Sequence, residues 1–333
     1  MRTNTLLWSL THTAREKSRV HTVGFVALAV SILSSSTSTS FAKQLGQSLS
    51  PLSLLLLSEL LALTFTCLSF GIVPIVREFL RLKRKDFFPL VTVGITNSIV
   101  APLLVFQGLR FTQAANTELF MRTEMLFLFV LAALFLNEKI EWRHLLSGLA
   151  VLAGILLVTV NDLGADYAAS TGDFLVIGAA AFYGIGGIIF KKFLVKLNPE
   201  MVIAMRSVIA IAFFLSATPF IEHTIVEELQ SFPLALVGVL IGYGLFARFL
   251  NLFSFYEAME RLPVFTISLI LPVGTLGSIA FAHFYLGEHI AWYHIFGGIS
   301  IVIGSLIMEI GSWTLEKKKH HEPHLLHHFR RHA

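Results

Sequence analysis

The stretch FLNEKIEWRHLLSGLAVLAGILL (residues 135–157) returns 150 residues later as YLGEHIAWYHIFGGISIVIGSLI (residues 285–307). Matching glutamates, tryptophans, histidines and glycines at one fixed offset indicate an internal duplication. A duplicated half in an apolar chain is typical of a secondary transporter, because two related bundles can enclose a site that opens to either side of a membrane. The identical pairs include Leu136/Leu286, Glu138/Glu288, Ile140/Ile290, Trp142/Trp292, His144/His294, Gly148/Gly298, Gly154/Gly304 and Leu156/Leu306.

Composition places the chain in a membrane before any motif is considered. Hydrophobic residues make up 55% of its 333 residues, charged residues make up 14%, and the mean hydropathy is +0.75. Soluble domains have about 25% charged residues. The single cysteine, Cys67, lies in an apolar run, so a disulfide or a cysteine metal site within one chain is excluded. These values predict an all-α, polytopic membrane protein.

Apolar stretches of membrane length recur along the whole chain. A bilayer core about 30 Å thick requires about 20 mostly apolar residues per helix. The first stretch contains SSSTSTS (residues 34–40); its hydroxyls either line a wet cavity or let helices approach closely, and we favour close approach. The ten transmembrane helices that we expect are near 22–42, 52–76, 87–109, 116–136, 143–160, 173–191, 200–220, 233–256, 263–286 and 291–312.

The Lys and Arg residues predict the orientation of these helices. With both termini in the cytoplasm, 20 of the 25 Lys and Arg fall in cytoplasmic segments, and only Lys43 and Arg110 fall in external ones. Such an excess of positive charge is typical of cytoplasmic loops. Five helices per half is an odd number, so the second half enters the membrane from the opposite side. We therefore predict two inverted repeats, which can alternate between inward-open and outward-open forms.

The expected organisation follows from the spans. Transport is expected to run on a gradient or on mass action, because the sequence contains no Walker-type nucleotide loop. The predicted units are a cytoplasmic segment at 1–21, a first five-helix repeat at 22–160, an external linker at 161–172, a second repeat at 173–312 and a cytoplasmic tail rich in histidine and basic residues at 313–333.

Two duplicated motifs carry a family resemblance. Each long apolar helix ends in an acidic dipeptide, Asn137-Glu138 or Gly287-Glu288, followed by a short turn and a helix with spaced glycines. The segments leading into these helices are GLRFTQAANTELF (108–120) and AMERLPVFTISLI (258–270). Between Val23 and Trp313 the chain resembles the drug/metabolite transporter superfamily, and specifically its EamA-type members. The resemblance implies a carrier or exporter of small organic solutes, located in the bacterial inner membrane, with a central cavity between the halves.

Arg122 is the clearest departure from the family pattern. EamA-type copies usually carry a proline early in the fourth helix of each half; the second half has Pro272, but the first half has Arg122 at the equivalent position. Charged side chains at this depth cost at least about 2.5–3.5 kcal/mol, so they persist when they are paired, hydrated or functional. Glu118 lies four residues earlier on the same face. Either the two form an internal ion pair, or Arg122 binds a substrate carboxylate or phosphate.

Further polar residues inside the spans are candidates for substrate binding or proton coupling. Arg248 lies mid-span with Asn251 nearby and no carboxylate within one turn, and Glu124 is the partner that we expect for it. Glu124 and Glu59 are the candidate proton carriers, although a buried glutamate such as Glu59 is slightly better explained as a neutral structural group. The candidate substrate-binding set is Arg122, Arg248, Glu118, Asn251 and Asn97.

The duplicated motif residues are interpreted as structural. Glu138 and Glu288 stand at helix ends in tight turns, where a carboxylate can accept backbone N–H bonds and favour the N-terminus of the following helix. Pro272, Gly148 and Gly298 belong to the same structural set. A proline at position 272 frees a backbone carbonyl and loosens the helix near the cavity, and the two glycines are among the spaced glycines of the duplicated helix.

Two classes of function stay open. The first is a carrier that exports or exchanges a small anionic or zwitterionic metabolite. The second is a metal-responsive membrane sensor that uses the tail KKKHHEPHLLHHFRRHA (317–333). An enzyme is not expected, because the spans contain no nucleophile-base pair. We expect a small-molecule substrate and membrane lipid as partners, no cofactor, no resident metal and no nucleic acid; a homodimer is compatible with the sequence.

Overall fold

The computed structural model describes residues 22–136, 142–163, 167–194, 197–217, 225–262, 270 and 273–321, and the regular structure in them is helical throughout. Within these described ranges, six helices are long and apolar enough to cross a membrane by length and composition. They span Thr22–Leu45, Pro51–Phe70, Arg84–Gly108, Thr171–Leu194, Glu200–Ala217 and Leu234–Phe255, and shorter apolar helices span Leu145–Asn161, Val273–Leu286 and Trp292–Ile307.

Nine of the ten predicted spans overlap these apolar helices, although most of the first ten residues of the span predicted at 263–286 lie outside the described residues. The tenth span is interrupted. The stretch predicted at 116–136 forms two helices that meet at Arg122. After the helix at 22–36, the first half consists of α2 (Ser38–Leu45), α3 (Pro51–Phe70), α4 (Ile72–Leu80), α5 (Arg84–Ile95), η1 (Thr96–Val100), α6 (Ala101–Gly108), α7 (Ala114–Met121), α8 (Thr123–Leu136) and α9 (Trp142–Leu163).

The second half repeats the same order of elements. Its described helices are α10 (Tyr167–Ile189), η2 (Phe190–Leu194), α11 (Pro199–Ala217), α12 (Ile225–Gln230), α13 (Leu234–Gly242), η4 (Tyr243–Leu250), α14 (Asn251–Arg261), α16 (Val273–Leu286) and α17 (Trp292–His321). Helical structure extends beyond the predicted spans at two places. Most of the linker expected at 161–172 is helical, because α9 and α10 both extend into it, and α17 continues past residue 312 to His321.

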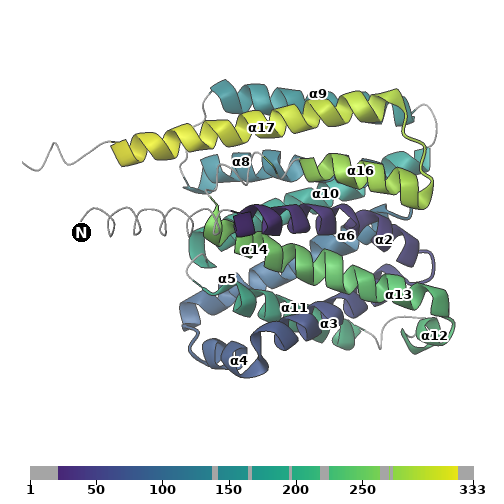
Figure 1. Cartoon of the computed structure of the whole chain (residues 1–333), viewed down its shortest axis with the longest axis vertical. Helices are drawn as coiled ribbons and strands as arrows, with labels where there is room; N and C mark the ends of the chain where they lie inside the picture. Colours follow the sequence, from purple (N-terminus) through teal and green to yellow (C-terminus); the bar gives the residue numbers. More distant parts are fainter. Residues whose placement is uncertain are drawn as a thin grey trace, which may run out of the picture.

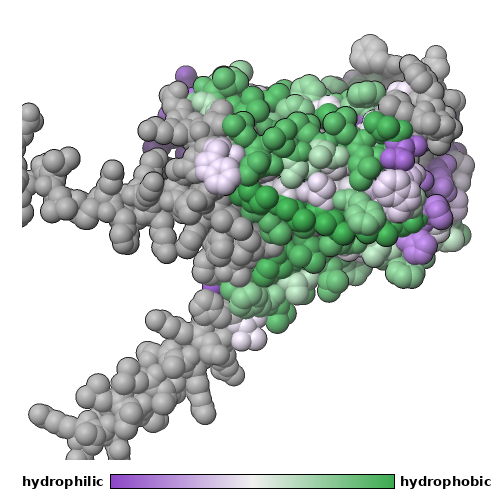
Figure 2. All heavy atoms as spheres, turned by 90° about the horizontal axis from the view of Figure 1, so that it is seen from above, coloured by the Kyte–Doolittle hydropathy of each residue, from purple (hydrophilic) through white to green (hydrophobic). Residues whose placement is uncertain are grey.

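The long helices lie roughly side by side, with α9 and α17 together on one face of the bundle (Figure 1). The helix at 22–36 begins and α17 ends at the same end of this bundle (Figure 1). This arrangement is the one expected for an even number of crossings. Figure 2 looks onto the α9/α17 face and shows a broad hydrophobic area between more hydrophilic ends, as expected for a surface in contact with lipid.

The equivalent helices α9 and α17 pack antiparallel. A β-carbon added at Gly154 would lie 2.7 Å from Ile301 Cγ1, and one added at Gly304 would lie 2.8 Å from Val151 Cγ2. Gly154 corresponds to Gly304, and Val151 to Ile301, at the 150-residue offset. Each contact is therefore the image of the other under a two-fold rotation, which is the relation expected of inverted repeats.

Residues on this pseudo-two-fold axis meet their own equivalents. The Ser300 hydroxyl donates to the carbonyl oxygen of Ala150 at 2.8 Å, and these two positions are 150 residues apart. Nearby, the Ser147 hydroxyl donates to the carbonyl oxygen of Gly304 at 2.5 Å. Such close backbone approach requires small residues.

The tightest glycine contacts in this interface are not at the two glycines that the sequence analysis singled out as structural. Gly148 was expected to be structural, but a β-carbon there would meet only Leu126 Cδ2, at an ordinary 3.6 Å, and one at Gly298 would come no nearer than 3.3 Å to Leu119 Cδ2. The tight backbone contacts are at Gly154 and Gly304. Gly148 lies on a part of α9 that has room for a side chain, so close packing does not require a glycine there.

Each repeat contains a π-helical turn at the same place in its third long helix. In the first half it is η1 (Thr96–Val100), and in the second it is η4 (Tyr243–Leu250), whose last five residues are the equivalents of η1. π-Helical turns inside α-helices occur frequently at functional sites. Asn97 and Arg248, both candidate residues, lie in these two turns.

Candidate functional site

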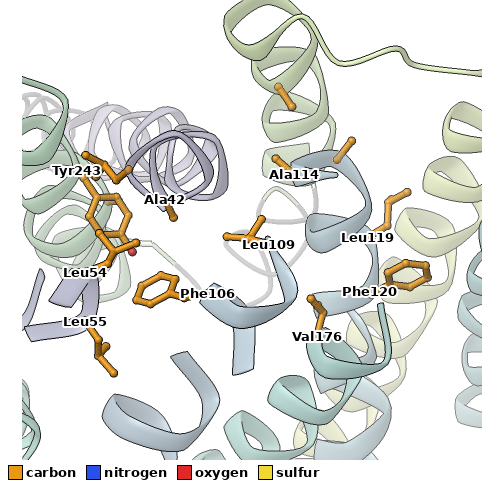
Figure 3. Close-up of a cluster of buried hydrophobic side chains, with 14 of the residues drawn as sticks. Ala42, Leu54, Leu55, Phe106, Leu109, Ala114, Leu119, Phe120, Val176 and Tyr243 are labelled. Atoms are coloured by element: carbon orange, nitrogen blue, oxygen red, sulfur yellow. The ribbon is translucent and has the colours of Figure 1, made fainter. Parts of the chain in front are cut away.

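A cavity of about 270 Å³ lies between helices of the two repeats. Its polar wall contains Glu118, Arg122, Glu124, Arg248 and Asn251, so five of the predicted residues converge on one site. Its apolar wall includes Phe106 and Met121. Figure 3 shows Ala42, Phe106, Leu109 and Tyr243, which line the cavity, in the same buried cluster as Leu54 and Leu55.

Arg122 lies at an interruption of its helix. Its N–H donates to the Leu119 carbonyl at 3.1 Å, and its own carbonyl accepts from Met125 at 3.2 Å, so the chain makes tighter turns here. The position that corresponds to Pro272 in the first repeat is thus a helix interruption, and it is occupied by an arginine. Arg122 Nη2 lies 3.8 Å from Glu118 Oε2, and Nε is buried with no hydrogen-bond partner among the described residues.

Arg248 pairs with Glu59 of α3 and not with Glu124, so the predicted pairing was wrong. Glu59 is 2% exposed and also accepts a hydrogen bond from the Ser207 hydroxyl at 2.6 Å. The η4 turn and the crossing of α3, α11 and η4 place these side chains together although they lie far apart in the sequence. A buried ion pair of this kind neutralises both charges, and breaking it leaves one charge without compensation.

Glu124 faces the same cavity with a different environment. Within the described parts of the chain it makes no hydrogen bond or ion pair, and Tyr183 and Tyr243 line the cavity with it. The lining therefore combines two arginines, two glutamates and two phenols around a small space. Such a site can bind an anionic group and a cationic group of one solute at the same time.

Family membership follows from comparison with known proteins. The model of the EamA-like transporter family matches residues 22–160 and again residues 170–310, which is most of the chain in two copies. The chain belongs to the EamA-like transporter family. It is an integral membrane protein of a transporter family, and not an enzyme.

Individual relatives support the family assignment. An uncharacterized transporter of Methanothermobacter thermautotrophicus is 26% identical over 231 residues, covering 68% of this chain and 66%, just under two thirds, of that protein. An uncharacterized transporter of Synechocystis sp. is 26% identical over 318 residues, covering 90% of each chain. A crystal structure of another protein matches with a TM-score of 0.60 at 16% identity, over 90% of this chain and 99% of that chain. At this identity the likeness shows the fold alone.

Asn251 and Asn97 have different places in this EamA-like transporter. Asn251 lines the cavity and accepts a hydrogen bond from the Ser31 hydroxyl at 2.9 Å, which ties the first helix to α14. Asn97 is not part of the cavity lining and packs against Gly186 of α10. Its carbonyl accepts from Arg206 Nη2 at 3.1 Å, and Ser98 accepts from Arg206 Nε at 3.2 Å. Asn97 therefore lies outside the cavity lining, in contact with α10 and Arg206.

The Ser/Thr-rich stretch of the first helix both lines the cavity and lets a neighbouring helix approach closely, the two alternatives that the sequence left open. Ser36 packs against the α16 backbone and donates to the Gly274 carbonyl at 3.3 Å, in agreement with close approach. Ser35, Ser38 and Thr39 line the cavity. Sequence reasoning favoured close approach and therefore missed three hydroxyls of the EamA-like transporter's cavity, although the polar run itself was the signal. Tyr183 and Tyr243 gave no signal, because a tyrosine in an apolar run is ordinary.

Glu288 caps a helix, but a different one from that predicted. Its carboxylate accepts from the backbone N–H groups of Ala114 at 2.8 Å and Ala115 at 3.0 Å, at the start of α7 in the other repeat, and not from the helix that follows it. Lys43 Nζ lies 2.9 Å from the same carboxylate. The remaining predicted motif residues, Glu138 and Pro272, lie outside the described residues, as does most of the histidine-rich tail. In the described parts of the chain no group of three His, Cys, Asp or Glu could hold a metal ion.

Proposed function

We propose that this protein is a secondary transporter that moves a small anionic or zwitterionic metabolite, such as an amino acid, by alternating access, as an exporter or exchanger. The observation that carries the proposal is the paired cation and carboxylate lining of a cavity between two antiparallel repeats. Inverted repeats can exchange conformations, so that one site faces each side of the membrane in turn.

Arg122 is the proposed contact for the substrate carboxylate. Its contact with Glu118, at 3.8 Å through one nitrogen, is longer than a hydrogen bond. The buried Nε has no partner among the described residues, so one edge of the guanidinium can take a carboxylate in bidentate geometry. Glu118 and Glu124 can then hold the ammonium group of a zwitterion.

The size of the cavity supports a small solute. Pockets for drug-sized ligands usually enclose about 300–1,000 Å³, and this one encloses about 270 Å³. An amino acid suits that space better than a nucleotide sugar. Phe106, Met121 and the two tyrosines provide a wall for its apolar part.

Arg248 is the second proposed contact for the anionic group of the substrate, and Glu124 and Glu59 are assigned to proton coupling. Glu59 neutralises Arg248 in this structure, and a substrate carboxylate can replace it as the partner of the arginine. Glu124 lines the cavity without an ion pair among the described residues, so it is our first choice for a proton carrier, with Glu59 second. We place the protein in the cell membrane with both termini in the cytoplasm, on the distribution of Lys and Arg.

A reconstituted system tests the proposal. Purified protein in proteoliposomes is screened for uptake of labelled zwitterionic, anionic and cationic amino acids, nucleotide sugars and organic cations, with and without a pH gradient. Arg122→Gln and Arg248→Gln are expected to reduce uptake strongly. Arg110→Gln, an exposed arginine outside the cavity, serves as the control. Uptake equal to wild type in both cavity variants would remove these arginines from the site.

The sensor alternative makes the opposite prediction about the tail. Deleting residues 317–333 is expected to leave uptake unchanged if the protein is a carrier. Loss of all function in that variant, with Zn²⁺ binding to the wild-type protein, would favour the sensor.

A further inference from the structure

One polar cluster outside the cavity joins the two repeats at one end of the bundle. Glu288, from the second repeat, receives the first two N–H groups of α7 and lies against Lys43 of α2. Lys43 Nζ also donates to the carbonyl oxygen of Thr112 at 2.8 Å. We name Lys43, Glu288 and the first turn of α7 (Ala114 and Ala115) the inter-repeat latch.

The latch lies directly beyond the cavity. Ala42, Leu109 and Glu118 line the cavity, and the latch residues are their close neighbours in the chain: Lys43 follows Ala42, and Ala114 lies between Leu109 and Glu118. The same segments therefore continue from the cavity wall into the latch. Opening this end of the cavity requires α2 and α7 to separate from the turn that carries Glu288.

We propose that the inter-repeat latch holds this end of the transporter closed, and that Lys43 and Glu288 are positioning residues whose release is a step of the transport cycle. This inference rests on the proposed alternating-access function. It assigns to the duplicated Gly-Glu motif a part in the mechanism beyond a local turn.

The contacts of the latch are strong but can be exchanged for water. The two α7 N–H groups are at a helix N-terminus, where they have no partner within their own helix and attract a carboxylate. The Glu288 side chain is 8% exposed and that of Lys43 is 24% exposed, so water reaches the rim of the cluster. When the repeats separate, water can hydrate both charges and both N–H groups, which makes the closure reversible.

The conformation of the turn at Gly287 sets the position of Glu288 at the end of α16. Gly287 has a φ of 70°, a left-handed conformation that suits glycine, and it ends α16 by donating its N–H to the His283 carbonyl at 3.0 Å. A β-carbon at Gly287 would meet nothing within 4 Å, so glycine is needed there for its conformation and not for space. Neighbouring contacts tie the same end together: the Thr112 hydroxyl donates to the buried Asp173 at 2.5 Å, and Tyr285 donates to Gln44.

Cysteine accessibility tests the latch in the full-length protein. In a Cys67→Ser background, Ser38→Cys places one thiol in the cavity. Its rate of modification by a membrane-impermeant methanethiosulfonate is measured separately in right-side-out and inside-out vesicles. Glu288→Gln and Lys43→Met are expected to raise the rate from one side about tenfold, the population shift that loss of one charge-assisted hydrogen bond produces. His289→Gln, an exposed neighbour, and Arg110→Gln are the matched controls and should leave the rate unchanged.

A second measurement covers the case in which a variant fails to fold. In the Cys67→Ser background without Ser38→Cys, Lys43→Cys combined with Glu288→Cys is cross-linked with a short bifunctional methanethiosulfonate. This reagent spans the gap left by the two long side chains, forms a reducible disulfide with each thiol and holds the latch closed. The cross-linked protein is expected to lose uptake of whichever screened solute the wild type transports, and a reductant should restore it. Uptake that survives cross-linking, or labelling rates that do not change in folded variants, would overturn the latch. Absence of uptake of every screened solute by the wild type would instead count against the proposed function.

Discussion

Replacing Gly304 by alanine is expected to destabilise the protein through the contact between α9 and α17. The added β-carbon would lie 2.8 Å from the Ser147 carbonyl oxygen and 3.0 Å from the Val151 nitrogen. These are backbone atoms of a long helix, and they cannot rotate away as a side chain would. Overpacking of this kind usually costs about 1–3 kcal/mol.

Gly148→Ala is the matched control because it makes the same chemical change in the partner helix. A β-carbon there meets only Leu126 Cδ2, at 3.6 Å. Both substitutions gain about 1 kcal/mol of intrinsic helix propensity. That gain cancels in the comparison, so the difference between the two variants isolates the packing cost of about 1–3 kcal/mol, or roughly a 5- to 150-fold change in the unfolding equilibrium.

Reversible unfolding in mixed micelles, followed by circular dichroism, measures this difference. The pseudo-two-fold relation adds a stricter expectation: Gly154→Ala should cost about as much as Gly304→Ala. The double variant should cost less than the sum, because separating the helices once relieves both contacts. If Gly304→Ala proved as stable as Gly148→Ala, the antiparallel packing of the equivalent helices would be refuted.

Three further substitutions test other parts of the structure. Arg122→Lys keeps the charge but loses the planar guanidinium, so uptake of a carboxylate solute is expected to fall at least tenfold; wild-type uptake would show that bidentate binding is not used. Ser207→Ala removes the hydroxyl bonded to Glu59 and should lower the unfolding free energy by about 1–3 kcal/mol, whereas Ser216→Ala, at an exposed site, should not; equal effects would contradict the buried network. Gly287→Ala should cost about 1–2 kcal/mol for its positive φ, and Gly287→Asn less, in the same unfolding assay; identical costs would argue against a left-handed turn.

Much of the fold was readable from the sequence, because membrane-spanning helices obey simple length and composition rules. The duplication of residues 135–157 at 285–307 predicted two repeats, and the antiparallel packing of α9 on α17 agrees with their predicted inversion. The interruption at Arg122 was not predicted. Most of the residues around Arg122 are good helix formers, so hydrophobic periodicity alone predicts one continuous helix across this position. The π-helical turns η1 and η4 were not predicted either, because a change from α-helical to π-helical hydrogen bonding does not alter the amino-acid composition.

The sequence predicted most of the charged residues that line the site, but not which arginine and glutamate form an ion pair. Intramembrane charges are rare and expensive, so Arg122, Arg248, Glu118 and Glu124 were conspicuous. Which carboxylate meets Arg248 depends on how α3 crosses η4, a contact between residues 189 positions apart. A helical-wheel argument sees only one helix, and it therefore chose Glu124. The same limit explains why Glu288 was assigned to the helix that follows it in sequence.

Counterflow across proteoliposomes tests the central claim most directly. Vesicles containing the protein are loaded with a high concentration of unlabelled solute and diluted into a trace of the labelled solute. A single cavity that faces each side in turn predicts a transient overshoot of labelled solute inside, which Arg122→Gln abolishes and Arg110→Gln retains. Labelled solute that only approaches equilibrium, with no overshoot in the wild-type protein, would contradict alternating access through this cavity.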